Sequence, residues 1–242
     1  QDIATKVGID KVDEDGKPLS GAVLQLLDAA GTEVEQWTTD GTTHRIDAVL
    51  TAGAEYTLHE VSAPDGYCVA ADQKFTVNAD GSLTSVKLTN LSTKVQISKT
   101  TITGDTELEG AKLEVRDLSG NALDSWTSGK EAHMITAKLT AGQTYVLHET
   151  AAPNGYVVSN DIEFTVNADG TVTKVIMKDD TTKVEISKKA ENGLPLSGAK
   201  MQLLDKDGKE VDAWTTDGKA HTLTAKLTAG ATYTLHEVSA PA

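Results

Sequence analysis

The stretch YTLHEVSAPDGY, residues 56–67, has the pattern of a β-strand that runs into a turn. Tyr56, Leu58 and Glu60 occupy alternate positions, and alternate side chains of a strand point to the same face. The letters APDG that follow are typical of a turn. If the two large apolar side chains face a core, Glu60 faces it as well, and a carboxylate is costly to bury without a partner. The glutamate therefore needs a physical explanation.

The same stretch returns twice, as YVLHETAAPNGY at 145–156 and as YTLHEVSAPA at 233–242. A second motif, TKVxIxK, also occurs three times, beginning at Thr5, Thr93 and Thr182. Its spacings are 88 and 89 residues (93 − 5 and 182 − 93), which is the size of a small domain. The repeats predict two complete domains and a third without its last strands, with the boundaries 1–91, 92–180 and 181–242.

Each repeat consists of short β-branched runs with period-two alternation, and no stretch has a helical pattern. Clusters of Gly, Asp, Asn and Pro separate the runs. In the first repeat the runs predict strands at 5–12, 22–28, 33–39, 44–50, 55–61, 67–70, 73–78 and 83–90. The expected fold class is all-β, a sandwich of about seven strands in each domain. The linkers at 90–94 and 179–183 are short, which predicts a semi-rigid rod with hinge motion at two points.

The net charge, the cysteine content and the absence of recognisable targeting motifs limit the functions and cellular contexts that the sequence suggests. The 242 residues include 36 acidic and 22 basic ones, a net charge of −14, which argues against binding to nucleic acid or to an anionic membrane. The single cysteine, Cys68, cannot form an internal disulfide, and we expect it to be a small buried residue because Val157 takes its place in the next repeat. Neither a signal peptide nor a wall-sorting motif is recognisable, as expected for an internal piece of a larger protein.

The first strand of each repeat ends its apolar face with a lysine. Val7, Ile9 and Lys11 share one face in the first repeat, and the equivalent lysines are Lys99 and Lys188. Three further lysines lie on the opposite face and are expected in solvent: Lys6, Lys94 and Lys183.

The last strand also ends its apolar face with a polar residue. Val86, Leu88 and Asn90 share a face in the first repeat. In the second repeat Val175 aligns with Val86, which places Asp179 at the position of Asn90 and Asp180 beside it. Three strand ends therefore present a lysine, a glutamate and an asparagine or aspartate to one interior.

Two interpretations of this polar cluster follow from the residues alone. The lysine and the glutamate can form a partly buried ion pair to which the amide is hydrogen-bonded, although such a pair contributes little to stability. Alternatively, burial favours the neutral forms of both groups. A neutral lysine is a nucleophile, and a protonated glutamic acid can polarise a carboxamide and relay protons.

Three stretches resemble a known family: ISKTTITGDTELEGAKLEVRD at 97–117, YVLHETAAPNGY at 145–156 and FTVNADG at 164–170. With their counterparts in the other repeats, they closely resemble the Cna B-type (SpaA-like, prealbumin-like) domains of Gram-positive surface adhesins and pilins. The resemblance implies tandem Ig-like or prealbumin-like Greek-key β-sandwiches. It also implies a spontaneous isopeptide bond between the first and last strands of a domain, formed with the help of the glutamate.

Carried over by position, the resemblance implies two bonds. Lys11 would attack the side-chain carbonyl of Asn90 with the assistance of Glu60, releasing ammonia. In the second repeat, Lys99 would attack Asp179 with the assistance of Glu149, releasing water; an aspartate must be protonated to react, which a low-dielectric site favours.

The third repeat departs from this pattern. It has Lys188 and Glu237 but no acceptor strand before residue 242. Two explanations remain open: the sequence stops before the acceptor strand, or a strand donated in trans by another chain completes the sheet.

The resemblance implies a structural stalk on the cell-wall-anchored, extracellular surface of a Gram-positive bacterium. Its partners would be other domains of the same surface protein, a sortase and a host matrix protein. Bond formation happens once for each domain, so the protein is not expected to be an enzyme, and neither a cofactor nor a metal is expected.

A ligand-binding adhesin region is the alternative function. A ligand site confined to one repeat would appear as a difference between repeats, but the tryptophans recur in all three, at Trp37, Trp126 and Trp214, and are expected to be structural. Each repeat also has two histidines: His44 and His59, His133 and His148, His221 and His236. The second of each pair alternates outward, and no third ligand stands at a recognisable spacing for a metal.

Overall fold

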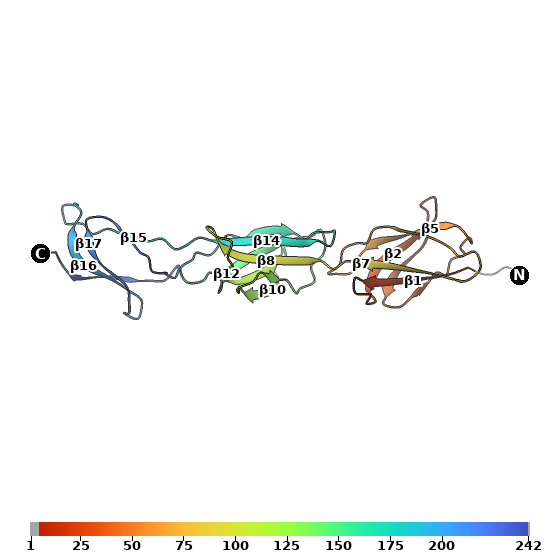
Figure 1. The fold of residues 1–242 in the computed structure, drawn as a ribbon, viewed down its shortest axis with the longest axis horizontal. Coiled ribbons are helices and arrows are strands. Elements are labelled where there is room, and N and C mark those ends of the chain that lie inside the picture. The colour runs from red at the N-terminus through yellow and green to blue at the C-terminus, as the bar shows by residue number, and fades with distance from the viewer. Residues whose placement is uncertain (1–4, 242) are drawn as a thin grey trace.

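The computed structural model describes residues 5–241, a range that contains strands and turns but no helix. The strands form three β-domains that follow one another along the long axis of the molecule (Figure 1). The domain of β1–β7 lies at one end, that of β8–β14 in the middle and that of β15–β19 at the other end. The all-β tandem architecture expected from the sequence is confirmed. Within the described range no helix is long and apolar enough to span a membrane.

The first domain has seven strands: β1 (Lys6–Asp13), β2 (Ser20–Leu27), β3 (Glu33–Asp40), β4 (His44–Arg45), β5 (Glu55–Ser62), β6 (Gln73–Thr76) and β7 (Leu83–Asn90). They form a three-stranded sheet of order β4-β1-β7 and a four-stranded sheet of order β3-β2-β5-β6. The core between the sheets includes Ile9 and Val86 from the first sheet and Leu24 and Leu58 from the second. These side chains occupy alternate positions on their strands and point into the core, as period-two alternation in the sequence predicts.

The second domain repeats this arrangement with β8 (Lys94–Thr101), β9 (Lys112–Arg116), β10 (Ala122–Thr127), β11 (His133–Met134), β12 (Thr144–Ala151), β13 (Ile162–Thr165) and β14 (Val172–Asp179). Its sheets have the orders β11-β8-β14 and β10-β9-β12-β13. The same sequence pattern thus gives the same two-sheet sandwich twice.

The first and last strands of each complete domain pair in parallel. In the first domain the register places Lys11 opposite Leu88 and Asp13 opposite Asn90. In the second domain the register is equivalent and places Lys99 opposite Met177. Because the pairing is parallel, the chain enters a domain at one end of this strand pair and leaves it at the other end.

The predicted strand at 67–70 is wrong. This segment contains only an isolated bridge between Tyr67 and Ser92. Its backbone donors bind elsewhere: the Cys68 N–H donates to the Leu91 carbonyl at 2.8 Å, and the Ala70 N–H donates to the Glu60 carboxylate at 2.5 Å. Because these two donors bind a linker carbonyl and a side chain, the segment does not join a ladder.

The predicted strand at 44–50 is also wrong in its length. Only His44–Arg45 pair with β1 as β4. The N–H groups of Asp47 and Ala48 then donate to the Glu35 carboxylate, at 3.1 and 3.3 Å. The Glu35 side chain, which comes from β3, therefore accepts the backbone hydrogen bonds that a neighbouring strand would accept if β4 were longer.

The third domain contains β15 (Glu185–Ile186), β16 (Ser197–Leu204), β17 (Glu210–Asp217), β18 (His221–Thr222) and β19 (Thr234–Ser239), in sheets of order β15-β18 and β17-β16-β19. Among its described residues, 182–241, no strand takes the place of β7 or β14. The inward face of β19 is consequently uncovered: Leu235 is 47% exposed, whereas Leu58 and Leu147, at the equivalent positions, are fully buried.

At both junctions between domains, the APxGY turn of one domain contacts a lysine side chain of the next. At the first junction, Gly66 of the APDG turn packs against the side chain of Lys138 in the following domain. At the second junction, Gly155 packs against Lys226, and its N–H donates to the Leu227 carbonyl at 3.1 Å. A turn of one domain therefore docks on the next domain, in addition to the covalent linker.

Cys68 is buried at the first junction, as predicted for a small core-like residue. Its Sγ lies 3.7 Å from the Asn167 carbonyl of the second domain. Burial raises the pKa of the thiol above its ordinary value. Val157 at the equivalent position is 41% exposed, because the described part of the third domain has no loop like that of Asn167 to cover it.

Candidate functional site

The first domain brings Lys11, Glu60 and Asn90 together in its interior. Lys11 Nζ lies 3.6 Å from Glu60 Oε1, and Asn90 Nδ2 donates to the same oxygen at 2.9 Å. Lys11 comes from β1, Asn90 from the end of β7 and Glu60 from β5 in the facing sheet. The cluster therefore joins the first and last strands of one sheet to the glutamate of the other.

All three side chains are almost completely buried, with exposed fractions of 4% for Lys11, 1% for Glu60 and zero for Asn90. Burial lowers the pKa of Lys11 below its ordinary value, and the nearby Glu60 only partly opposes that shift. The Asn90 Oδ1 accepts no hydrogen bond. The site therefore holds a lysine displaced toward its neutral form beside a carboxamide whose oxygen is unpaired.

The second domain repeats the cluster with Lys99, Glu149 and Asp179, which are also buried. Lys99 Nζ lies 3.2 Å from Glu149 Oε1 and contacts Asp179 Oδ1. Burial raises the pKa of Glu149, and the Asp179 charge acts in the same direction, against the opposing effects of the Ser159 N–H and Lys99. The shift favours the protonated acid, the form that can donate a proton.

Both glutamates are fixed by one backbone donor from the segment after the APxGY turn. The Ala70 N–H donates to Glu60 Oε2 at 2.5 Å, and the Ser159 N–H donates to Glu149 Oε2 at 2.7 Å. Sequence reasoning missed this contribution because it predicts a strand at 67–70, whose N–H groups would bind a neighbouring strand and not a side chain. Ala70 and Ser159 both lie three residues after the tyrosine of the APxGY motif. This shared spacing is the one sequence signal that could have indicated a shared role.

The alternative lysines and the alternative aspartate lie outside these clusters. Lys6, Lys94 and Lys183 are exposed, as the parity of their strands predicts. Asp180 accepts a hydrogen bond from Lys183 Nζ at 2.8 Å on the surface, whereas Asp179 is fully buried.

The described part of the third domain brings Lys188 and Glu237 together without an acceptor. Lys188 Nζ donates to Glu237 Oε2 at 2.8 Å, and the two side chains are 28% and 33% exposed. Within the described part of this domain, no asparagine or aspartate strand stands beside Lys188. The pair is a partly solvated ion pair, in contrast to the buried clusters of the first two domains.

The tryptophans stack on histidines in all three domains. The ring centroids of Trp37 and His44 are 4.2 Å apart with an interplanar angle of 12°, and the equivalent pairs are Trp126–His133 and Trp214–His221. Each tryptophan lies on one sheet and each histidine on the edge strand of the other, so the stack connects the two sheets. This packing role agrees with the structural interpretation of the tryptophans.

The second histidine of each pair lies at the surface. His59 and His148 form hydrogen bonds with Asp72 and Asp161, at 2.7 and 2.6 Å, and His236 is exposed. In the described range 5–241, no group of three metal-ligating side chains is arranged to hold an ion.

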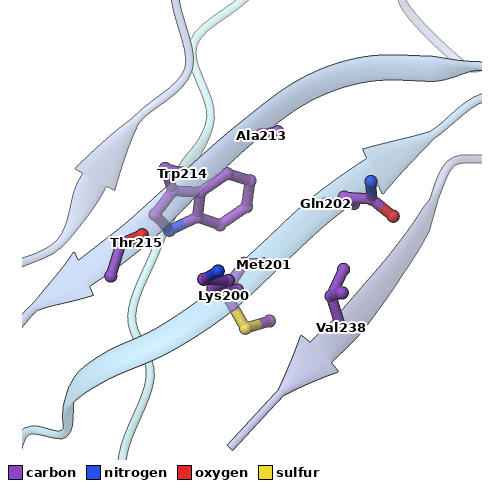
Figure 2. Close-up of a pocket in the computed structure, with 7 residues that line it drawn as sticks. All are labelled: Lys200, Met201, Gln202, Ala213, Trp214, Thr215 and Val238. Atoms are coloured by element: carbon purple, nitrogen blue, oxygen red, sulfur yellow. The ribbon is translucent and has the colours of Figure 1, made fainter. Parts of the chain in front are cut away.

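A shallow hollow on the third domain takes its residues from the sheet β17-β16-β19 (Figure 2). Its apolar lining consists of Met201, Ala213, Trp214 and Val238, and Lys200 is the only ionisable residue among the seven described residues that line it. The hollow therefore lacks the convergent polar groups that the buried clusters have.

Comparison with known proteins places these features in a family. A family model described as the SpaA prealbumin-like fold domain matches residues 5–92, 93–181 and 182–242. Among curated proteins, none matches the sequence significantly.

Solved structures that resemble the chain include the TIE protein of Bacillus anthracis, with 26% identity and a TM-score of 0.50 over 99% of this chain and 46% of that one. A Streptococcal ancillary pilin has 25% identity and a TM-score of 0.36 over 74% and 63% of the two chains. BcpA, the major pilin subunit of Bacillus cereus, has 17% identity and a TM-score of 0.38 over 98% and 88%. The chain spans about half the length of the TIE protein. With the family matched along nearly its whole length, the chain belongs to the SpaA prealbumin-like fold domain family, in three tandem copies.

Proposed function

We propose that the chain is a stalk or shaft module of a Gram-positive cell-surface adhesin or pilus, braced by spontaneous intramolecular isopeptide bonds. The observation that supports it is the burial, in two domains, of a lysine on the first strand and a carboxamide or carboxyl group on the last strand beside a glutamate of the facing sheet. Ordinary ion pairing would not require the third group, and a buried pair is weak support for stability.

In the first domain, Lys11 Nζ in its neutral form attacks Cγ of Asn90. Glu60 lies within reach of both groups, at 3.6 Å from Nζ and 2.9 Å from Nδ2. It takes a proton from the attacking nitrogen and gives it to Nδ2, which leaves as ammonia. The new bond joins Nζ to Cγ, and Oδ1 stays as the amide oxygen.

In the second domain, Lys99 Nζ attacks Cγ of Asp179, and one carboxyl oxygen leaves as water. Glu149 lies 3.2 Å from the attacking nitrogen and is biased by burial toward its protonated form. Each reaction occurs once, so the product is a modified stalk and no substrate is turned over.

The position of the bonds suits a load-bearing role. Each bond would join the strand on which tension enters a domain to the strand on which tension leaves it. The residues between Lys11 and Asn90 would then be shielded from extension. Docking of each APxGY turn on the following domain adds stiffness at the junctions.

The cellular setting is part of the same proposal. The streptococcal and B. cereus structures are of pilins, as their names state. An extracellular, wall-anchored location follows for a shaft module, with other domains of the same surface protein as neighbours and a sortase and a host matrix protein as further partners.

The intact mass of the denatured chain tests the proposal. Loss of ammonia and of water predicts a deficit of about 17 plus 18 Da against the sequence mass. Glu60→Gln should abolish the first loss and Glu149→Gln the second, each against the variant's own sequence mass. Glu237→Gln is the matched control, since no acceptor strand lies beside it in the described part of its domain. If the unaltered chain has its full sequence mass, no bond has formed and the clusters are buried ion pairs.

A further inference from the structure

The two buried clusters differ at the residue whose backbone N–H holds the glutamate. Ala70 in the first domain corresponds to Ser159 in the second, and both backbone N–H groups hold the local glutamate. Only Ser159 has a hydroxyl, and it stands in the domain whose acceptor is an aspartate. The hydroxyl and the type of acceptor therefore change together between the two domains.

The contacts of the Ser159 hydroxyl restrict the position of its proton. Its Oγ lies 2.5 Å from the Lys178 carbonyl oxygen and 2.8 Å from Asp179 Oδ1. A carbonyl oxygen can only accept a hydrogen bond, and a hydroxyl has one proton to donate. When Ser159 donates to Lys178, its contact with Asp179 is favourable only if the carboxyl group carries the proton and donates it to Oγ.

The second oxygen of the aspartate gives independent support. Asp179 Oδ2 is buried and has no hydrogen-bond partner. Leaving a charged oxygen unpaired in the interior is more costly than leaving a neutral carbonyl oxygen unpaired. Lys99 Nζ also donates to Oδ1, and the hydroxyl oxygen of an acid can accept this bond while it donates its own proton to Ser159 Oγ. The contacts of both oxygens therefore fit a neutral carboxylic acid, protonated on Oδ1 and with Oδ2 as the carbonyl.

We infer that Ser159 is a positioning residue for the aspartate acceptor: its hydroxyl holds Asp179 as the neutral acid, with Oδ1 as the oxygen that leaves as water. This inference rests on the proposed isopeptide chemistry and adds a requirement to it. Lys99 Nζ bonds to Cγ, the C–Oδ1 bond breaks, and the departing hydroxyl takes the proton that Nζ loses through Glu149. Oδ2 becomes the amide oxygen.

The first domain needs no such hydroxyl. An asparagine side chain is neutral at every relevant pH, and Asn90 Nδ2 already donates to Glu60 at 2.9 Å. An alanine at position 70 is therefore sufficient for an amide acceptor. The difference between the two domains predicts that the hydroxyl matters only when the acceptor is an acid.

The test follows bond formation in the full chain by intact mass. Unreacted polypeptide, isolated in denaturant, is refolded by dilution and quenched at intervals. Ser159→Ala should slow the loss of 18 Da about tenfold, the effect of one hydrogen bond on a rate. The loss of 17 Da in the first domain should keep its rate in the same molecules. Because the first domain folds with alanine at this position, the substitution is compatible with the fold.

Acceptor exchange separates positioning from a merely structural effect. Ser159→Ala combined with Asp179→Asn should restore fast bonding, now with loss of 17 Da. In the first domain, Asn90→Asp should react slowly, and Asn90→Asp with Ala70→Ser should recover.

Two results would overturn the inference: an unchanged rate of the 18 Da loss in Ser159→Ala, or a double variant Ser159→Ala/Asp179→Asn that stays as slow as the single one. Failure of the proposed function would look different. In that case the unaltered chain would lose mass in neither domain.

Discussion

Removing one glutamate should convert one inextensible domain into an extensible one. In the first domain the proposed bond encloses residues 12–89, which is 78 residues (89 − 12 + 1). At about 3.6 Å per residue, this loop has a contour length of about 280 Å. While the bond is intact, tension applied at the ends of the chain cannot reach any of it.

The variant Glu60→Gln makes that length available. The domain from Lys6 to Asn90 has 85 residues (90 − 6 + 1), or about 310 Å of extended chain. Its folded span is the eight-residue strand β1, about 26 Å at about 3.3 Å per residue. Unfolding should therefore add about 280 Å of contour length.

Single-molecule force spectroscopy with handles at the two termini measures this increment. The unaltered chain should show no event of this size from the first two domains, and Glu60→Gln and Glu149→Gln should each add one. The third domain, which has no acceptor strand in the described range, extends in every variant and serves as an internal reference. Two events of about 280 Å in the unaltered chain, or none gained in Glu60→Gln, would refute the proposed load path.

Three further predictions concern stability, pH and the junctions. Glu60→Gln should lower the free energy of unfolding of the first domain by about 4 to 5 kcal/mol, the entropy of closing a loop of this length, in a guanidinium titration; an equal midpoint would argue against a crosslink. Burial lowers the pKa of Lys11, so its neutral fraction, and with it the rate of the 17 Da loss during refolding, should rise as the pH rises toward the ordinary lysine value; a rate that falls over this range would contradict a lysine nucleophile. Gly155→Ala should broaden the distances between spin labels on the second and third domains, because its Cβ would lie 2.8 Å from the Lys226 side chain. Gly142→Ala, also at positive φ but with nothing within 4 Å, should leave them unchanged, and equal broadening in both would show that the junction contact is unimportant.

Alternation in the sequence is sufficient to predict which polar side chains are buried in the two clusters. Lys11, Glu60 and Asn90 each follow apolar residues at steps of two on their strands, so a strand that buries its apolar residues must bury them as well. The same rule excluded Lys6, which is exposed. Their roles in bond formation stay predictions, since geometry brings them together without showing a bond.

The remaining features depend on contacts that no periodicity encodes. Residues 67–70 look like a strand in sequence, but their N–H groups bind Glu60 and the linker. The role inferred for Ser159 depends on where the segment after a turn crosses the end of the sandwich. The junction residue Lys138 could not be predicted, because its contact with Gly66 requires the placement of one domain on another.

Because β1 pairs in parallel with β7, and β8 with β14, successive domains extend in one direction along the molecule. In each complete domain the chain is displaced by about one strand length, and the following domain starts where that displacement ends. Antiparallel first and last strands would return the chain to its entry side and fold the array back on itself. With the parallel arrangement, duplication of one repeat adds a fixed increment of reach without a new interface. The length of the array is thus set by the number of its repeats.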